Sequence, residues 1–313
     1  MKQTFTPKQL VEIDALNAAA KHPDVSIQQD EQAYQARLDT AADQILQRGT
    51  RIIMLTGPSS SGKTTTCQRL AMTLADRGVP AQVISLDNFF IGAEYYPILP
   101  NGKKDYESPA TLDMPEIHRC LRQLYEDGWA DLPIYDFANE RRADERQRVE
   151  LNGGVCIMEG LHALNPILTE IMPEESVFFI YAGLREEYAR AGKRVITTRD
   201  IRLCRRVLRD VATRGHSPEK TLSMWQGVLD GENQYVKPFK NRADLILNTS
   251  HRYEMNIIAD LVDNALDMTD PASPYYSMME RTAACFTGIT PLSARLVPQN
   301  SMLREFYDQY ENA

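Results

Sequence analysis

The chain has 313 residues, 43% hydrophobic and 25% charged, which is the balance of a soluble protein with a sizeable core. Its formal net charge of -8 argues against nucleic acid or an anionic membrane as the main partner, because both attract excess Lys and Arg. The sequence has neither an apolar run long enough to span a bilayer nor a signal-peptide pattern. Its five cysteines are widely spaced without a C-x-x-C pair, so we expect a reduced, cytoplasmic enzyme without disulfides or zinc.

Helices and short apolar strands alternate along the chain. Two polar helices are expected first, at 7–21 and 28–48. Five near-continuous apolar strands follow, at 51–56, 81–86, 155–158, 176–181 and 244–248, with helices at 64–77 and 114–127 among them. Strands of this kind separated by helices predict an α/β fold, in which helices cover both faces of a mainly parallel five-stranded sheet.

The expected domain organisation follows from these elements. Residues 1–48 form an N-terminal helical extension and residues 49–270 form the main domain. Within that domain, 88–150 is a loop-rich insertion expected to bind substrate, and 185–230 is a lid region. Residues 271–313 form a C-terminal helical extension for which the sequence indicates no function.

A phosphate-binding loop follows the first apolar strand. The run Gly57-Pro-Ser-Ser-Ser-Gly-Lys-Thr64 fits the pattern G-x-x-x-x-G-K-[ST] and opens a helix, which is the context that makes this motif credible. Its backbone N–H groups and the helix N-terminus suit a phosphate chain. The motif predicts a three-layer α/β/α fold of the P-loop NTPase type. The residues expected to bind ATP are Gly57, Pro58, Ser59, Ser60, Ser61, Gly62, Lys63, Thr64 and Thr65.

Two carboxylates close neighbouring strands. Asp87 follows the second strand and Glu159 the third, and in a parallel sheet the ligand lies beyond the carboxyl ends of the strands. One carboxylate can accept the proton of an attacking hydroxyl while the other helps to hold Mg²⁺. We assign Asp87 as the base and expect Thr64, Glu159 and Asp87 at the metal.

The charge reverses locally between residues 185 and 214, where ten Lys or Arg stand against four acids. Arg202, Arg206 and Arg209 fall on one face of a helix, and an apolar stripe that includes Leu203 and Val207 falls on another. An arginine face with its own apolar anchor suits a helical lid that closes over phosphates and neutralises charge during transfer.

Several stretches together resemble the uridine kinase/phosphoribulokinase family, in its order and spacing over roughly residues 50–250. These stretches are 57–66, 85–90, 105–109 with Asp113, 133–137, 158–162, 205–210 with Arg214 and Gly215, and 237–239 with Ala243 and Asp244. The segments 161–166, 214–217 and 297–306 are similar to a bacterial nucleoside kinase branch. Kinases of that branch usually carry a threonyl-tRNA-synthetase-like N-terminal region, which we expect to be lacking here.

The resemblance implies an ATP- and Mg²⁺-dependent kinase that phosphorylates the 5′-hydroxyl of a nucleoside such as uridine or cytidine, in pyrimidine salvage. It implies that Asp87 takes the hydroxyl proton and that Glu107 holds the ribose hydroxyls. Tyr106, Tyr135 and Phe137 would embrace the base. The groups expected to act on the phosphates are Lys63 and three lid arginines, Arg206, Arg209 and Arg214. The resemblance also allows a homo-oligomer, as a dimer or tetramer.

The chain departs from the family pattern where the base is read. Glu140 stands at a position where uridine–cytidine kinases carry a His, and Met224 stands at a Gln position. A carboxylate cannot donate a hydrogen bond to a uracil carbonyl as an imidazole can. We nevertheless expect Glu140 and the nearby Arg142 at the substrate.

Two other functions stay open. A sugar phosphate is an alternative acceptor, since four cations, Lys103, Lys104, Arg141 and Arg142, lie in the insertion. A nucleotide-sensing module without turnover is the other alternative. The joint presence of Lys63, Asp87 and the lid arginines speaks against it, because a sensor has little use for a base.

Overall fold

The computed structural model describes residues 7–310, and its centre is a five-stranded sheet in the order β10-β7-β2-β6-β3. Every neighbouring pair in this sheet is parallel. The strands are β2 (Ile52–Thr56), β3 (Ala81–Ser85), β6 (Val155–Glu159), β7 (Val177–Gly183) and β10 (Leu245–Asn248). The predicted α/β fold is therefore confirmed, with strand bounds within two residues of those expected.

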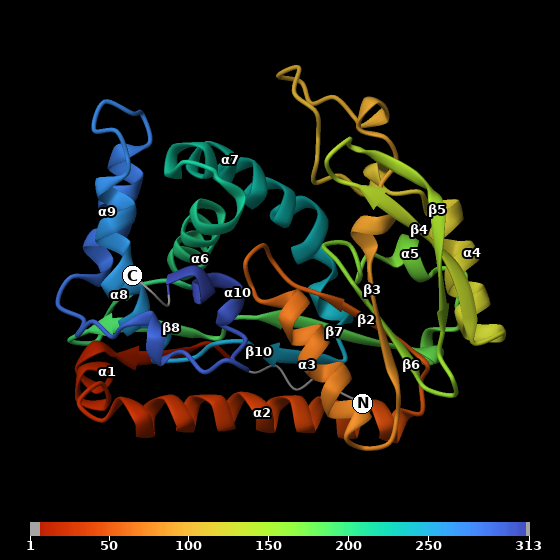
Figure 1. Cartoon of the computed structure of the whole chain (residues 1–313), viewed down its shortest axis with the longest axis horizontal. Helices are drawn as coiled ribbons and strands as arrows, with labels where there is room; N and C mark the ends of the chain where they lie inside the picture. The colour runs from red at the N-terminus through yellow and green to blue at the C-terminus, as the bar shows by residue number, and fades with distance from the viewer. Residues whose placement is uncertain (1–6, 311–313) are drawn as a thin grey trace.

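Helices cover both faces of the sheet because its strands are apolar on both sides. In β2, Ile53 and Leu55 belong to one core cluster, while Ile52 and Met54 belong to the other. The first cluster packs beneath α2 (Pro23–Arg48), α3 (Lys63–Ala75) and α8 (Glu254–Asp267), and the second beneath α4 (Met114–Glu126). Figure 1 shows α2 running beneath the main sheet and ending short of the lobe that contains α4.

The insertion between β3 and β6 forms a separate lobe. It contains short 3₁₀ turns, α4 and an antiparallel hairpin of β4 (Trp129–Asp136) and β5 (Arg141–Glu150). The two strands and α4 stand to one side of the main sheet (Figure 1). We expected a loop-rich insertion with one helix here. The hairpin was not predicted, because β5 is rich in charged residues and lacks a clear apolar alternation.

A second small sheet was also missed. β8 (Glu186–Arg190) pairs with β9 (Lys193–Ile196) and with β1 (Gln9–Glu12), which lies in the segment expected to be one helix. Only α1 (Ile13–Ala19) remains of that helix. The strand forms because Gln9 N–H reaches the Arg185 carbonyl at 2.8 Å, a tertiary contact that local sequence does not reveal.

Helices follow the small sheet. Besides α8, those after β9 are α6 (Thr198–Arg214), α7 (Pro218–Gly231), α9 (Tyr276–Phe286) and the short α10 (Arg304–Tyr307). A one-turn helix α5 (Pro166–Thr169) follows β6. The C-terminal segment returns to α6, where Tyr310 Oη donates to the Leu208 carbonyl at 3.0 Å. Within residues 7–310, none of the helices has the length and apolarity that a bilayer crossing requires.

Candidate active site

The loop between β2 and α3 turns its backbone into a cradle. Ser60 and Gly62 have positive φ, 57° and 84°, and such residues, alternating with residues of ordinary φ, turn neighbouring backbone N–H groups toward one anion. A side chain on Gly57 would collide with the Ala182 carbonyl of β7, and one on Gly62 would collide with Met302. Glycine is therefore required at both ends of the loop.

Polar atoms in this loop fit a phosphate chain. Ser60 Oγ and Ser61 Oγ are buried, and neither has a hydrogen-bond partner among residues 7–310. Lys63 Nζ lies 3.4 Å from the Pro58 carbonyl, which is a long hydrogen bond. Buried groups of this kind cost free energy unless a ligand satisfies them, so their arrangement suits a bound triphosphate.

The strand-end carboxylates meet at this loop as expected. Thr64 Oγ1 lies 3.4 Å from Glu159 Oε1. Asp87 faces the open cavity but lies deep among protein atoms, and this burial raises the pKa of its carboxyl, against the attraction of Lys63 and Arg214. Burial likewise raises the pKa of Glu159, and Asp87 adds to that rise while Lys63 opposes it. Thr64, Glu159 and Asp87 thus form an oxygen-rich edge that could hold Mg²⁺ beside phosphates.

One cavity of about 260 Å³ joins these groups. Among the predicted site residues, its lining includes Ser59, Ser60, Ser61, Gly62, Lys63, Thr64, Asp87, Tyr106, Glu107, Glu159, Arg206, Arg209 and Arg214. Residues from the loop, two strand ends, the insertion and α6 therefore converge, although up to 155 positions separate them in sequence. This convergence is the main feature of the site.

The three arginines of this cavity share one carboxylate. Asp210 is buried on α6, and Arg209 Nη2 donates to its Oδ1 at 2.7 Å. Arg206 Nε lies 3.6 Å from Oδ2 and Arg214 Nη1 lies 3.5 Å from Oδ1. Arg206 also donates to Ser59 Oγ at 2.7 Å, so the cluster is fixed to the phosphate-binding loop.

Two neighbouring arginines do not line this cavity. Arg202, which the helical pattern placed on the same face as Arg206, is buried and pairs with Glu232, with Nη2 and Oε2 2.9 Å apart. Arg205 is fully buried and pairs with Glu254, with Nη2 and Oε2 2.7 Å apart. Both donate to loop carbonyls as well, Arg202 to Ser59 and Arg205 to Ser60, so they brace the cradle from behind.

Glu107 lines the same cavity as the P-loop and Asp87. The pKa of the Glu107 carboxyl is raised to about 7, chiefly by burial and in part by Glu232 and Asp105, against the opposing charges of Arg206 and Lys63. His162 lies behind it, and burial lowers the pKa of this imidazole to about 4, which keeps it neutral. A carboxyl that titrates near neutral pH and points into a cavity is suited to bind hydroxyl groups.

Phe90 and Tyr106 line the cavity and stand against further aromatic rings of the insertion, whereas the predicted Tyr135 and Phe137 are not among the lining residues. Tyr135 stacks edge-on against Phe137 and Phe90, with ring centroids 5.1 and 5.6 Å apart. Tyr106 stands against Tyr96 at 5.4 Å. Tyr106 and Phe137 are 54% and 62% exposed, which leaves ring surface for a flat ligand. The sequence did not single out Phe90 and Tyr96, because their part depends on how the insertion folds.

Glu140 and Arg142 are not among the cavity-lining residues. Glu140 occupies the turn of the β4–β5 hairpin with a positive φ of 50°. Arg142 Nη1 donates to Asp113 Oδ2 at 2.9 Å, while its Nε and Nη2 are buried without a partner in the described chain. Arg142 stands opposite Tyr135 in the hairpin, so these donors lie near the aromatic rings.

The C-terminal segment supplies one cavity residue that the sequence did not suggest. Glu305 Oε2 accepts a hydrogen bond from Thr65 Oγ1 at 2.7 Å, at the start of α3. Met302 packs on Gly62, and Phe306 lies against the guanidinium of Arg205 at 4.7 Å. Only a similarity of segment 297–306 to other kinases marked this region, and it gave no role to any residue.

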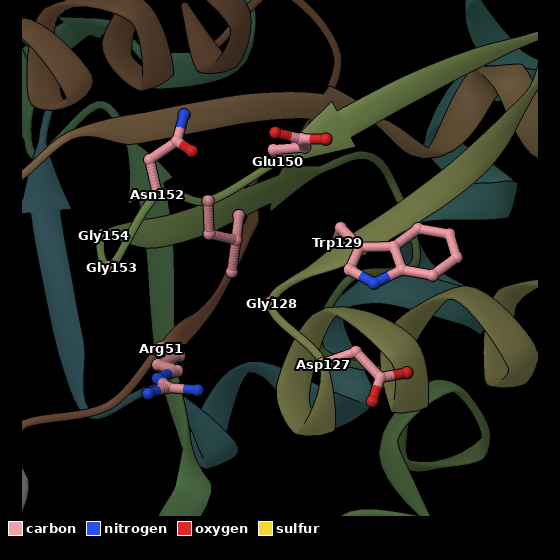
Figure 2. Close-up of a pocket in the computed structure, with 9 residues that line it drawn as sticks. Arg51, Asp127, Gly128, Trp129, Glu150, Asn152, Gly153 and Gly154 are labelled. Atoms are coloured by element: carbon pink, nitrogen blue, oxygen red, sulfur yellow. The ribbon is translucent and has the colours of Figure 1, made fainter.

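A different cavity, of about 380 Å³, opens beside the amino ends of β2 and β6 (Figure 2). Arg51 and Trp129 contribute to it, together with the glycine-rich turn before β6. Ligands of parallel α/β sheets bind at the carboxyl ends of the strands, where the P-loop lies. This second cavity is therefore no candidate for catalysis.

The fold and the cavity define a kinase of the P-loop class. The family model "Phosphoribulokinase / Uridine kinase family" matches residues 52–255, and the chain belongs to this family. It is thus a phosphotransferase that binds a nucleotide and a small substrate.

Relatives support this assignment. Uridine kinase of Deinococcus deserti is 29% identical over 197 residues, which cover 63% of this chain and 86% of that protein. Uridine kinase of Lactococcus lactis subsp. cremoris is 25% identical over 221 residues, which cover 70% and 98%. The structure is similar to that of a Silicibacter sp. TM1040 protein provisionally named a fructose transport system kinase, with a TM-score of 0.51 and 22% identity over 67% of this chain and 98% of the other. The structural likeness supports the fold.

Proposed function

We propose that this protein transfers the γ-phosphate of ATP to the 5′-hydroxyl of a pyrimidine nucleoside, uridine or cytidine. The observation that carries the proposal is the single cavity that joins the P-loop, Asp87, Glu107 and the α6 arginines. The named relatives, which are uridine kinases, support this choice of acceptor.

The donor would lie along the cradle of the P-loop. Its backbone N–H groups and the unpaired Ser60 and Ser61 hydroxyls suit the phosphate oxygens, and Lys63 would reach the β- and γ-phosphates. Thr64, Glu159 and Asp87 would hold Mg²⁺, which when bound neutralises charge on these phosphates.

Asp87 would act as the base. It accepts the proton of the 5′-hydroxyl while the hydroxyl oxygen bonds to the γ-phosphorus, and the bond from phosphorus to the β-bridging oxygen breaks to release ADP. Its raised pKa brings the carboxylate closer to working pH, where a base is most effective. Arg206, Arg209 and Arg214 would stabilise the charge on the phosphoryl group and would close as a lid that excludes water.

The nucleoside would lie between Glu107 and the aromatic rings. The Glu107 carboxylate would accept hydrogen bonds from the ribose 2′- and 3′-hydroxyls, and Tyr106, Tyr135 and Phe137 would contact the base. The unpaired Arg142 nitrogens are suited to a carbonyl oxygen of the base.

Those same nitrogens favour a second candidate, a sugar phosphate acceptor, because a guanidinium with two unpaired donors also suits a phosphate. ADP release should be measured with ATP and Mg²⁺ across a panel of nucleosides and sugar phosphates. Stimulation by uridine or cytidine supports the proposal. Stimulation by sugar phosphates alone supports the second candidate, and no stimulation by any acceptor removes both.

A further inference from the structure

A third cavity, of about 640 Å³, adjoins the P-loop at Pro58. The carboxyl end of β7, through Tyr181 and Gly183, and the loop residue Pro58 form part of its wall. Lys237 and Lys240 reach it from the 3₁₀ turn that precedes β10, and Lys8 reaches it from just before β1. Neither Asp87 nor Glu107 lines it, so it is separate from the transfer site.

The lining of this cavity is strongly cationic. Six cations line it, Lys8, Arg185, Arg199, Arg202, Lys237 and Lys240, against three carboxylates, Glu187, Asp200 and Glu232. Each carboxylate already has protein partners. Glu187 accepts from Lys8 at 2.6 Å and from Arg194 at 2.9 Å, Asp200 accepts from Thr197 N–H at 2.8 Å, and Glu232 pairs with Arg202. Positive charge therefore exceeds negative charge in a space large enough for a small molecule.

The pKa of Lys240 reflects the excess of positive charge in this cavity. The Lys240 ammonium lies 4.9 Å from the centre of the Tyr181 ring and is half-buried. Burial, together with repulsion from Arg185, Lys8 and Lys237, lowers the pKa of Lys240 to about 8. The start of α6, a helix of 17 residues, lines the same cavity at Thr198 and adds partial positive charge. An anion in this space would relieve the repulsion.

We infer that this cavity is a binding site for a phosphorylated small molecule, distinct from the site of phosphoryl transfer. Lysine and arginine side chains from separate elements, together with a helix N-terminus, are the groups that recognise phosphate. The cavity, of about 640 Å³, has room for a nucleotide as well as for a simple polyphosphate, so both are compatible with the lining.

The ligand of this site would influence the P-loop directly. Arg202 lines the cavity and donates to the Ser59 carbonyl at 2.9 Å, and Glu232, its partner, accepts from Ser59 N–H at 2.9 Å. An anion that attracts Arg202 competes with its hydrogen bond to the Ser59 carbonyl and with its ion pair to Glu232. The site is therefore placed to act on the phosphate-binding loop from outside the transfer cavity.

Calorimetric titration tests the inference with pyrophosphate and CTP as probes. The protein should carry Lys63→Ala, which disables the P-loop. If the ligand is a nucleotide, we expect pyrophosphate and CTP each to bind with a stoichiometry of one to one. If the ligand is a simple polyphosphate, we expect pyrophosphate to bind and CTP not to bind. Adding Lys237→Gln and Lys240→Gln should weaken binding at least tenfold. Lys237 is exposed, so Lys237→Gln alone gives a version of the test that does not disturb the half-buried Lys240.

The matched control adds Lys21→Gln and Lys220→Gln, which change two exposed lysines outside both cavities and should leave binding intact. The absence of binding by Lys63→Ala, or equal binding after loss of Lys237 and Lys240, would overturn the inference. So would a large rise in the KM for ATP when Lys237→Gln and Lys240→Gln are placed in the otherwise unchanged enzyme, because the lysines would then belong to the ATP site. Binding requires no turnover, so this result is independent of whether the proposed nucleoside is the acceptor.

Discussion

At the scale of single residues, the site depends on carboxyl groups whose surroundings differ. Burial raises the pKa of Asp87, and the charges of nearby Lys63 and Arg214 oppose that rise. Glu107 experiences both cations and carboxylates, and its burial dominates. The carboxyl group of Asp87 is thus suited to accept a proton, whereas that of Glu107 titrates near neutral pH.

Replacing Asp87 with Asn should lower kcat by about 10²–10⁴-fold, because the amide cannot accept the hydroxyl proton. ATP binding, measured by calorimetry, should change little, since the P-loop is untouched. Asp76→Asn, at the C-terminal end of α3, is the control and should keep full activity. A near-normal kcat for Asp87→Asn contradicts the assigned role.

Replacing Glu107 with Gln should stabilise the protein increasingly as pH rises. The pKa of Glu107 is about 7 in the folded protein against an ordinary value of 4.5, so the folded state favours its protonated form. Ionisation of Glu107 therefore lowers the free energy of unfolding as pH rises from about 4.5 through 7. We expect Glu107→Gln to exceed the wild type by about 1–3 kcal/mol in free energy of unfolding at pH 8, and by less at pH 5. Urea unfolding at the two pH values measures this, and equal differences at both would refute the pKa assignment.

At the scale of elements, α6 separates structural from functional arginines. Arg205 is fully buried against Glu254, whereas Arg209 lines the transfer cavity and shares Asp210 with Arg206 and Arg214. The sequence pattern alone placed all the arginines of this helix in one cationic run. Only the packing of α6 against α8 and the C-terminal segment distinguishes them.

Replacing Arg205 and Arg209 with Met should therefore have different effects. Arg205→Met leaves Glu254 buried without its partner and should cost about 3–5 kcal/mol in free energy of unfolding. Arg209→Met should cost much less stability but lower kcat by about 100-fold, because it removes a donor aimed at the phosphoryl group. Thermal melting and steady-state kinetics distinguish the two variants. Equal losses of stability would contradict this division.

The P-loop and both strand-end carboxylates could be predicted because each depends on a short sequence pattern and on the general rule for parallel sheets. The pairing of β1 with β8 could not, because Gln9 and Arg185 are 176 positions apart and neither segment has a strong strand pattern of its own. Glu305 was missed for the same reason: its meeting with Thr65 depends on how the whole C-terminal segment folds back.

At the scale of the whole molecule, the C-terminal segment closes one side of the P-loop. Met302 covers Gly62, and Tyr307 Oη donates to Glu254 at 2.7 Å, which ties the segment to the core. Glu305 thereby places a carboxylate at the N-terminus of α3, where the phosphates of a nucleotide would bind. The residues beyond the family's matched range thus take part in shaping the donor site.

Replacing Glu305 with Gln should lower the KM for ATP by about threefold, because the like charge beside the phosphates is removed. Asp308→Asn removes a carboxylate three positions away that is 53% exposed, and it should leave the KM unchanged. The two variants should be compared by steady-state kinetics at low salt. A higher KM in Glu305→Gln would indicate that the carboxylate assists ATP binding instead.

The most direct test of the central claim follows the transferred phosphate itself. The protein is incubated with γ-labelled ATP, Mg²⁺ and either uridine or 5′-deoxyuridine, which lacks the proposed acceptor hydroxyl. We predict labelled uridine 5′-phosphate in the first reaction and no labelled nucleoside in the second. Labelling of 5′-deoxyuridine, or the absence of product with both uridine and cytidine, would contradict the account.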